Sequence, residues 1–126
     1  MWAKTLRVAV LPALSVVAIA VGVAACGEKR APEPPMSQGE RLSLSTGCSA
    51  CHGPSFEGGM GPKWTGLYMS KVTLDDGTKV TADEAYLTTA IKDPSAQHVK
   101  GTSVMPPNQL SDADVAAIVE FIKTLK

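Results

Sequence analysis

The sequence feature that most constrains the fold is the run Cys48-Ser49-Ala50-Cys51-His52. Two cysteines three positions apart, followed at once by a histidine, are typical of the covalent attachment of a c-type haem. On one helical turn both thiols face the same way, so each can bond one vinyl group of the haem. The histidine that follows then lies under the iron as its proximal ligand. The motif therefore predicts a chain folded around one covalent haem c, held by Cys48, Cys51 and His52.

Three other kinds of site share part of this pattern. A disulfide oxidoreductase motif is expected within a βαβ unit, which the flanking sequence does not predict. A zinc site needs four ligands, and only His98 and Cys26 remain as further histidine or cysteine. A plain structural disulfide is the third alternative. The complete motif and the missing zinc partners together favour haem.

The sixth ligand of the iron is predicted to be Met105. This residue stands in Ser103-Val104-Met105-Pro106-Pro107, where the prolines hold an extended backbone that can present one side chain rigidly. It also lies 53 residues beyond His52, which is enough chain to pass around the haem and return on its far side.

Met60, Met69 and His98 are the alternative sixth ligands. Met60 follows His52 by only eight residues, in a glycine-rich loop expected to stay on the proximal side. Met69 follows an aromatic residue and is predicted to pack in the core, the usual environment of a methionine. His98 is most simply interpreted as a solvent-facing loop residue.

The first 25 residues are predicted to be an export signal. Lys4 and Arg7 precede an almost unbroken apolar run, and 19 of residues 1–25 are apolar. The run ends in Val23-Ala24-Ala25-Cys26, which resembles the bacterial lipobox, where Cys26 would receive lipid and the chain would be cut before it. Ordinary cleavage near Ala25 and an uncleaved anchor are the alternatives. All three place the domain outside the cytoplasm, on the periplasmic side, and two of them tether it to a membrane.

The rest of the chain is read as a tether and one small domain. Residues 26–36 are polar and proline-rich, so they are expected to stay extended and to reach about 30 Å. Residues 37–126 are long enough for one small domain but not for a multidomain enzyme. From residue 26 onward the chain has ten bases and twelve acids, a net charge of −2, which argues against nucleic acid as a partner.

The domain is predicted to be all-α with a short β-hairpin insert. Capping-box patterns begin helices at Ser37 and Thr81, and a further helix begins at Ser111. The second helix is expected to end at Asp93-Pro94. Apolar residues recur at helical spacing in the last helix, at Val115, Ile118, Val119, Ile122 and Leu125. Between the first two helices, residues 72–80 read as a hairpin with an Asp-Gly turn.

From about Gln38 to Leu125 the chain resembles class I cytochrome c, in which three main helices surround a covalently bound haem. The resemblance rests on the haem motif, the Gly61-Pro62 loop, the Met105-Pro106 loop and the order of the helices. It implies that the Pro62 carbonyl accepts a hydrogen bond from the His52 ring. One departure is Met69, where the family usually has glycine.

A narrower resemblance is to the cytochrome c domain fused to subunit II of some bacterial haem-copper oxidases. It rests on the hairpin and on residues 83–87, 91–95 and 110–114. The chain has no copper-binding region and no paired membrane helices, so it is not such a subunit. The resemblance implies redox partner proteins, with a membrane haem-copper oxidase as acceptor and a quinol-oxidising complex upstream.

The expected function is that of a lipid-anchored, monohaem electron carrier of an extracytoplasmic respiratory chain. A His/Met iron has no open site, so catalysis by this chain alone is not expected. Two alternatives stay open. The first alternative to the electron carrier is the cytochrome subunit of a periplasmic dehydrogenase complex. The second, which applies if Met105 does not ligate, is a haem sensor or peroxidase-like enzyme.

Overall fold

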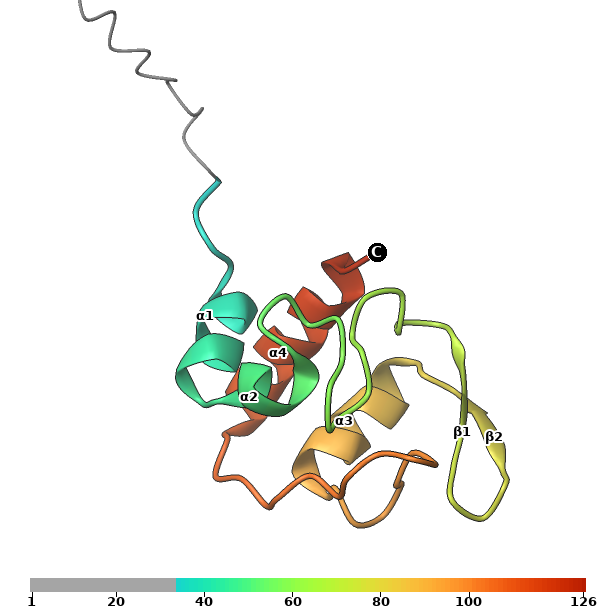
Figure 1. The fold of residues 1–126 in the computed structure, drawn as a ribbon. Helices are drawn as coiled ribbons and strands as arrows, with labels where there is room; N and C mark the ends of the chain where they lie inside the picture. Colours follow the sequence, from blue (N-terminus) through green and yellow to red (C-terminus); the bar gives the residue numbers. More distant parts are fainter. Residues whose placement is uncertain (1–33) are drawn as a thin grey trace, which may run out of the picture. The chain divides into compact units, whose positions relative to one another are not determined.

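The computed structural model describes residues 34–126. The predicted signal peptide, Cys26 and most of the predicted tether lie outside the described residues. Within them the chain forms four helices and a two-stranded antiparallel sheet, which confirms the prediction of an all-α fold with a hairpin insert (Figure 1). In chain order these elements are α1 (Gln38–Ser45), α2 (Cys48–His52), β1 (Lys71–Thr73), β2 (Lys79–Thr81), α3 (Glu84–Lys92) and α4 (Asp112–Thr124).

The helices begin at residues whose side chains accept otherwise unpaired backbone N–H groups. Ser37 caps α1, and Ser111 caps α4 in a complete capping box with Asp114. The predicted cap of α3 at Thr81 is wrong, because Thr81 pairs with Lys71 in the hairpin. Asp83 caps α3 instead, and its side chain accepts the Tyr86 N–H at 2.9 Å.

The core lies where α4 packs against α1 and α3. The predicted stripe of α4 is buried at Val115, Ile118, Val119 and Ile122. Phe121 is buried as well, and its ring meets the Phe56 ring edge-on at 5.2 Å between centroids. The stripe therefore continues into an aromatic contact with the loop after α2.

Gly39 allows α1 to approach α4 closely. A Cβ atom at Gly39 would lie 2.0 Å from the Ala117 carbonyl oxygen. Only glycine permits this separation of the two helices, so the short α1 is held directly against the backbone of α4.

The hairpin projects from the side of the domain away from α1 and α2 (Figure 1). Val72 pairs with Val80, and the Leu74 N–H donates to the Thr78 carbonyl at 2.8 Å, so residues 75–77 form the turn. Directly after β1, Leu74 forms an isolated antiparallel bridge with Val99, in the connection between α3 and α4. The insert is therefore tied to the segment that leads to Met105.

Within residues 34–126 there is no helix of the length and apolar character needed to cross a membrane.

Candidate functional site

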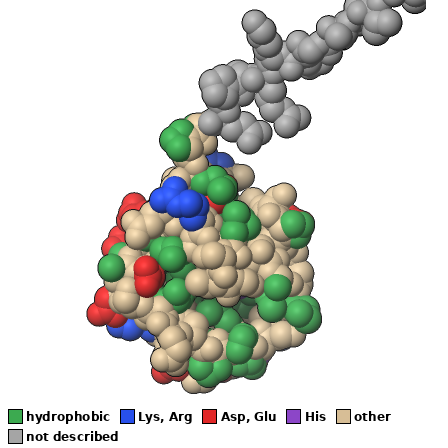
Figure 2. All heavy atoms as spheres, turned by 90° about the vertical axis from the view of Figure 1, so that its left-hand side faces the viewer, with side chains coloured by type: hydrophobic (Ala, Val, Ile, Leu, Met, Phe, Trp, Pro, Cys, Tyr) green, Lys and Arg blue, Asp and Glu red, His purple; other side chains and the backbone are tan. Residues whose placement is uncertain are grey.

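Cys48, Cys51 and His52 of the haem motif line a cavity of about 220 Å³ between α2, α3, α4 and the connection from α3 to α4. Most of its walls are apolar, formed by side chains such as Leu67, Leu87, Ile91, Ile118 and Ile122. Figure 2 shows hydrophobic side chains gathered in the lower half of one face of the domain, with charged side chains mainly above and to the left. An apolar cavity of this kind suits a flat, hydrophobic cofactor.

The short helix α2 brings both motif cysteines to the cavity. Gly47 has a φ of +81°, a left-handed conformation that glycine adopts without steric cost. The turn at this residue separates the end of α1 from the start of α2. Cys48 and Cys51 are half-buried, line the cavity and are not joined in a disulfide. Two free thiols one helical turn apart are what covalent attachment to two vinyl groups requires.

His52 is buried, and its ring is held by three contacts. Its Nδ1–H donates to the Pro62 carbonyl at 2.6 Å, because a carbonyl oxygen can only accept. The Trp64 ring packs against it at 4.7 Å between centroids, and a Cβ atom at Gly61 would lie 2.9 Å from the ring. These contacts fix the orientation of the ring. Because Nδ1 carries the proton, the lone pair of the Nε2 atom remains available to a metal.

The electrostatics of His52 also suit metal ligation. Burial lowers its pKa below the ordinary value, and the hydrogen bond to Pro62 partly offsets this effect. The imidazole is therefore neutral near pH 7, which is the form that binds iron.

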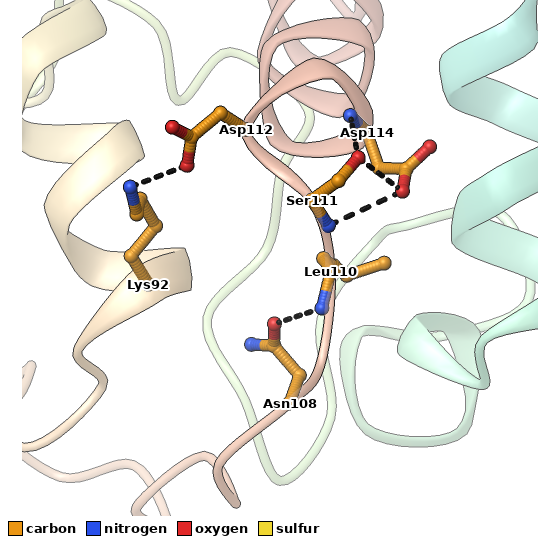
Figure 3. Close-up of polar contacts among 6 residues, drawn as sticks. All are labelled: Lys92, Asn108, Leu110, Ser111, Asp112 and Asp114. Carbon is orange, nitrogen blue, oxygen red and sulfur yellow. Dashed lines mark hydrogen bonds and ion pairs between the residues drawn. The ribbon is translucent and has the colours of Figure 1, made fainter.

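The loop that carries Met105 is fixed on both sides of that residue. Before it, the Ser103 N–H donates to the Met60 carbonyl at 2.8 Å. After it, the Asn108 side chain donates to the Ile91 carbonyl at 2.6 Å and accepts the Leu110 N–H at 3.2 Å. Figure 3 shows Asn108 directly below the start of α4, where the capping box of Ser111 and the Lys92–Asp112 ion pair hold the helix end.

Met105 is the only methionine of residues 34–126 that lines the main cavity. It also lines a smaller adjoining cavity of about 40 Å³ together with His52 and Met60. Met60 itself is 60% exposed, on the loop next to His52. The fold therefore brings Met105 and His52 together although they lie far apart in the sequence.

The prediction that Met69 packs in the core is wrong. Its side chain is 60% exposed and does not line the cavity. Its φ is +63°, in the left-handed region where glycine has no steric penalty. This backbone conformation explains why glycine is usual at the corresponding position of the family that the sequence resembles.

The prediction that His98 faces solvent is correct only in part. The side chain is 22% exposed, and its Nδ1 atom forms an ion pair with Asp75 in the hairpin turn. Its Nε2 atom is buried without a hydrogen-bond partner. His98 lines part of the cavity, and its Nδ1 atom is already paired with Asp75.

Comparison with known families agrees with this geometry. The family model described as Cytochrome c matches residues 36–126. The chain belongs to the cytochrome c family. One relative, cytochrome c2 iso-2 of Magnetospirillum molischianum, is 32% identical over 89 residues, which cover 63% of this chain and 91% of the relative.

As a cytochrome c with one CxxCH motif, the chain binds one haem c and transfers electrons. The residues present fit this cofactor, because the two thiols are free, the imidazole next to them is neutral and the cavity is apolar. When bound, the haem supplies the one-electron iron couple. Among residues 34–126 no cluster of three or more potential metal ligands forms a second metal centre.

Sequence reasoning missed several residues that position this site. Gly61 and Trp64 contact the His52 ring, and Asn108 holds the Met105 loop. Gly61 and Trp64 lie in or just after the Gly61-Pro62 loop, so the family resemblance, which implied the Pro62 hydrogen bond to His52, pointed to the correct region. Nothing local in the sequence indicates that Asn108 contacts Ile91.

Proposed function

We propose that this cytochrome c is a lipid-anchored carrier of an extracytoplasmic respiratory chain. It receives single electrons from a quinol-oxidising complex and delivers them to a membrane haem-copper oxidase. Three features support the proposal: a lipobox-like site at Cys26, the likeness to oxidase-fused cytochrome domains, and a methionine, Met105, that lines the same cavity as His52.

The observation that carries the proposal is the position of Met105. It is the one methionine of the described residues in the main cavity, on a loop held by Met60 on one side and Asn108 on the other. A thioether in the sixth position favours the ferrous state and raises the potential, while excluding exogenous ligands. Closed coordination suits an electron carrier and disfavours a haem sensor or peroxidase.

The ligation is tested with Met105→Ala, using Met60→Ala as the matched control because Met60 is exposed. Met105→Ala should keep its covalent haem, because attachment depends on Cys48 and Cys51. It should also lose the weak near-infrared band of Met-ligated ferric haem and bind carbon monoxide or cyanide readily. Met60→Ala should retain the band. If Met105→Ala keeps the parent spectrum and ligand affinity, Met105 is not the ligand.

The anchor is tested with Cys26→Ser in the full-length protein. Lipid attached at Cys26 would supply more than one acyl chain, which is enough for stable anchoring. The parent should incorporate labelled fatty acid and fractionate with membranes, whereas the variant should incorporate none and keep its haem. An unlabelled parent that behaves like the variant would instead indicate an ordinary signal peptide or an uncleaved anchor.

The partner is tested with the reduced full-length protein and isolated membrane complexes. Oxidation by a haem-copper oxidase should be fast, and it should slow when the anchor is removed, because tethering raises the effective concentration. Stoichiometric copurification with a periplasmic dehydrogenase, without transfer to the oxidase, would favour the alternative function of a dehydrogenase subunit.

A further inference from the structure

Two polar side-chain atoms in the wall of the haem cavity are buried without a hydrogen-bond partner. Within residues 34–126, these atoms are the Gln97 Oε1 and the His98 Nε2. Both residues line the main cavity, and they are neighbours in the connection from α3 to α4. Because an unpaired buried polar atom is costly, this part of the wall calls for a polar group that the protein itself does not supply.

The ring of His98 is oriented by the hairpin insert. Its Nδ1 atom forms an ion pair with the Asp75 carboxylate, and its carbonyl accepts the Asp75 N–H at 3.1 Å. The Lys100 N–H donates to the Thr73 carbonyl at 2.9 Å, which joins the same segment to β1. Because a carboxylate can only accept, Nδ1 carries a proton, and Nε2 is the ring atom left for a second partner.

His98 is also the residue of the cavity wall that can balance the charge of a haem. A haem c carries two propionate carboxylates at one edge of its ring. Among the described residues that line the cavity there is no lysine, arginine, aspartate or glutamate. The other histidine of the wall, His52, is neutral, and the motif assigns it to the iron. Since buried charges in proteins are paired, His98 is the cationic partner that this wall offers to a propionate.

The side of the cavity on which His98 lies agrees with this pairing. The vinyl groups and the propionates of a haem are carried by different pairs of pyrrole rings, on opposite edges of the macrocycle. Attachment to Cys48 and Cys51 holds the vinyl edge at α2. The hairpin, to which Asp75 ties His98, lies on the side of the domain away from α2 (Figure 1). The propionate edge is therefore directed away from α2, toward the wall that contains His98.

We propose that His98 binds one propionate of the haem, its imidazolium donating to Asp75 through Nδ1–H and to the propionate carboxylate through Nε2–H. The inference rests on the haem c of this family and does not depend on the proposed carrier role. Asp75 supports the cationic form, because the hydrogen bond to its carboxylate is the main cause that raises the pKa of His98. Rotation of the neighbouring Gln97 amide would present its NH₂ group to the same haem edge. The hairpin insert thus contributes to the haem site through Asp75 and His98.

The test measures two properties of the full-length, haem-loaded protein at about pH 6, below the ordinary histidine pKa of about 6.5. One is the midpoint potential. The other is the propionate bending band of the resonance Raman spectrum, which reports hydrogen bonding to the carboxylates.

Three variants are compared with the parent: His98→Ala, His98→Gln and Lys100→Gln. In His98→Gln, the side-chain amide places an N–H near the position of Nε2 but carries no charge. Lys100→Gln is the matched control, since it removes one exposed positive charge from the same segment.

In His98→Ala, the ratio of reduced to oxidised haem at a fixed potential should fall about fivefold, near the upper end for partly exposed charged pairs. The reason is that a nearby cation favours the ferrous haem, which has the more negative charge. The propionate band of this variant should also shift. His98→Gln should lower the ratio to a similar extent but keep a band closer to that of the parent, since it loses the charge and retains a donor. Lys100→Gln should change the ratio less than about twofold, because water and salt screen an exposed charge.

Other results would overturn this assignment. If His98→Ala keeps the parent's potential, or changes it with an unchanged propionate band, His98 does not bind a propionate. If Lys100→Gln lowers the ratio as much as His98→Ala, the effect is one of general charge. Should His98→Ala not fold, His98→Gln decides: a lowered ratio with a retained band supports the assignment, and the parent's ratio refutes it.

The near-infrared band of each protein separates this inference from the proposed ligation by Met105. A change in potential that occurs only in variants that lose the band would report loss of the methionine ligand and would refute the role of His98. A parent that lacks the band would refute ligation by Met105, and the comparison of the His98 variants would still decide whether His98 binds a propionate.

Discussion

Replacing Gly39 by alanine should destabilise the domain, although helix propensity predicts the opposite. Gly39 lies inside α1, where alanine is favoured by about 1 kcal/mol over glycine. The new Cβ atom, however, would lie 2.0 Å from the Ala117 carbonyl oxygen and 2.7 Å from the Phe121 Cβ atom. Ordinary contact begins at 3.4 Å, so α1 and α4 would have to separate by more than 1 Å.

The net effect follows from these two terms. Overpacking of a closely fitted core costs about 1–3 kcal/mol. Because the Ala117 carbonyl belongs to the backbone and cannot move aside like a flexible side chain, we expect a cost at or above the upper end of this range. After subtraction of the gain in propensity, we expect a loss of about 2 kcal/mol in the free energy of unfolding. For a domain of this size, that loss corresponds to a fall of about 10 °C in Tm.

The assay is thermal and urea unfolding of the haem-loaded protein, followed by circular dichroism. The double variant Gly39→Ala with Ala117→Gly is an informative control. Because the main obstacle is the carbonyl oxygen of residue 117 and not its methyl group, removing that methyl should not restore stability. A Tm for Gly39→Ala equal to or above that of the parent would refute the reasoning, and so would full rescue in the double variant.

Three further predictions concern the site and its surroundings. Met69→Gly should stabilise the protein against urea by about 0.5–1 kcal/mol, because it relieves a left-handed backbone; a loss of stability would contradict this. In Gly61→Ala, the new methyl group should press on the His52 ring and weaken its hydrogen bond to the Pro62 carbonyl. The midpoint potential of the haem should then rise in a redox titration. An unchanged potential would show that the contact at Gly61 does not tune His52. The rate of electron transfer to the acceptor should fall less than about tenfold from low to physiological ionic strength, because five bases and six acids are interspersed between His52 and Met105. A steeper fall would show strong steering.

Local patterns in the sequence determined the chemistry and the order of the elements. The CxxCH motif depends on spacing within one helical turn, so it predicts haem attachment without knowledge of the fold. The cap at Ser111 and the apolar stripe from Val115 to Ile122 likewise depend on neighbours three or four residues apart. The prediction that Thr81 caps α3 failed, because pairing with Lys71 across the hairpin took its place.

Only the tertiary structure decided which distant residues meet. It leaves Met69 exposed and outside the cavity, places Met105 in the same cavity as His52, and pairs His98 with Asp75 across 23 positions of sequence. The near contact of Gly39 with the Ala117 carbonyl is of the same kind. Such contacts depend on how whole helices and loops pack and on the space left between them. Residue type and local spacing carry little information about this packing or this space.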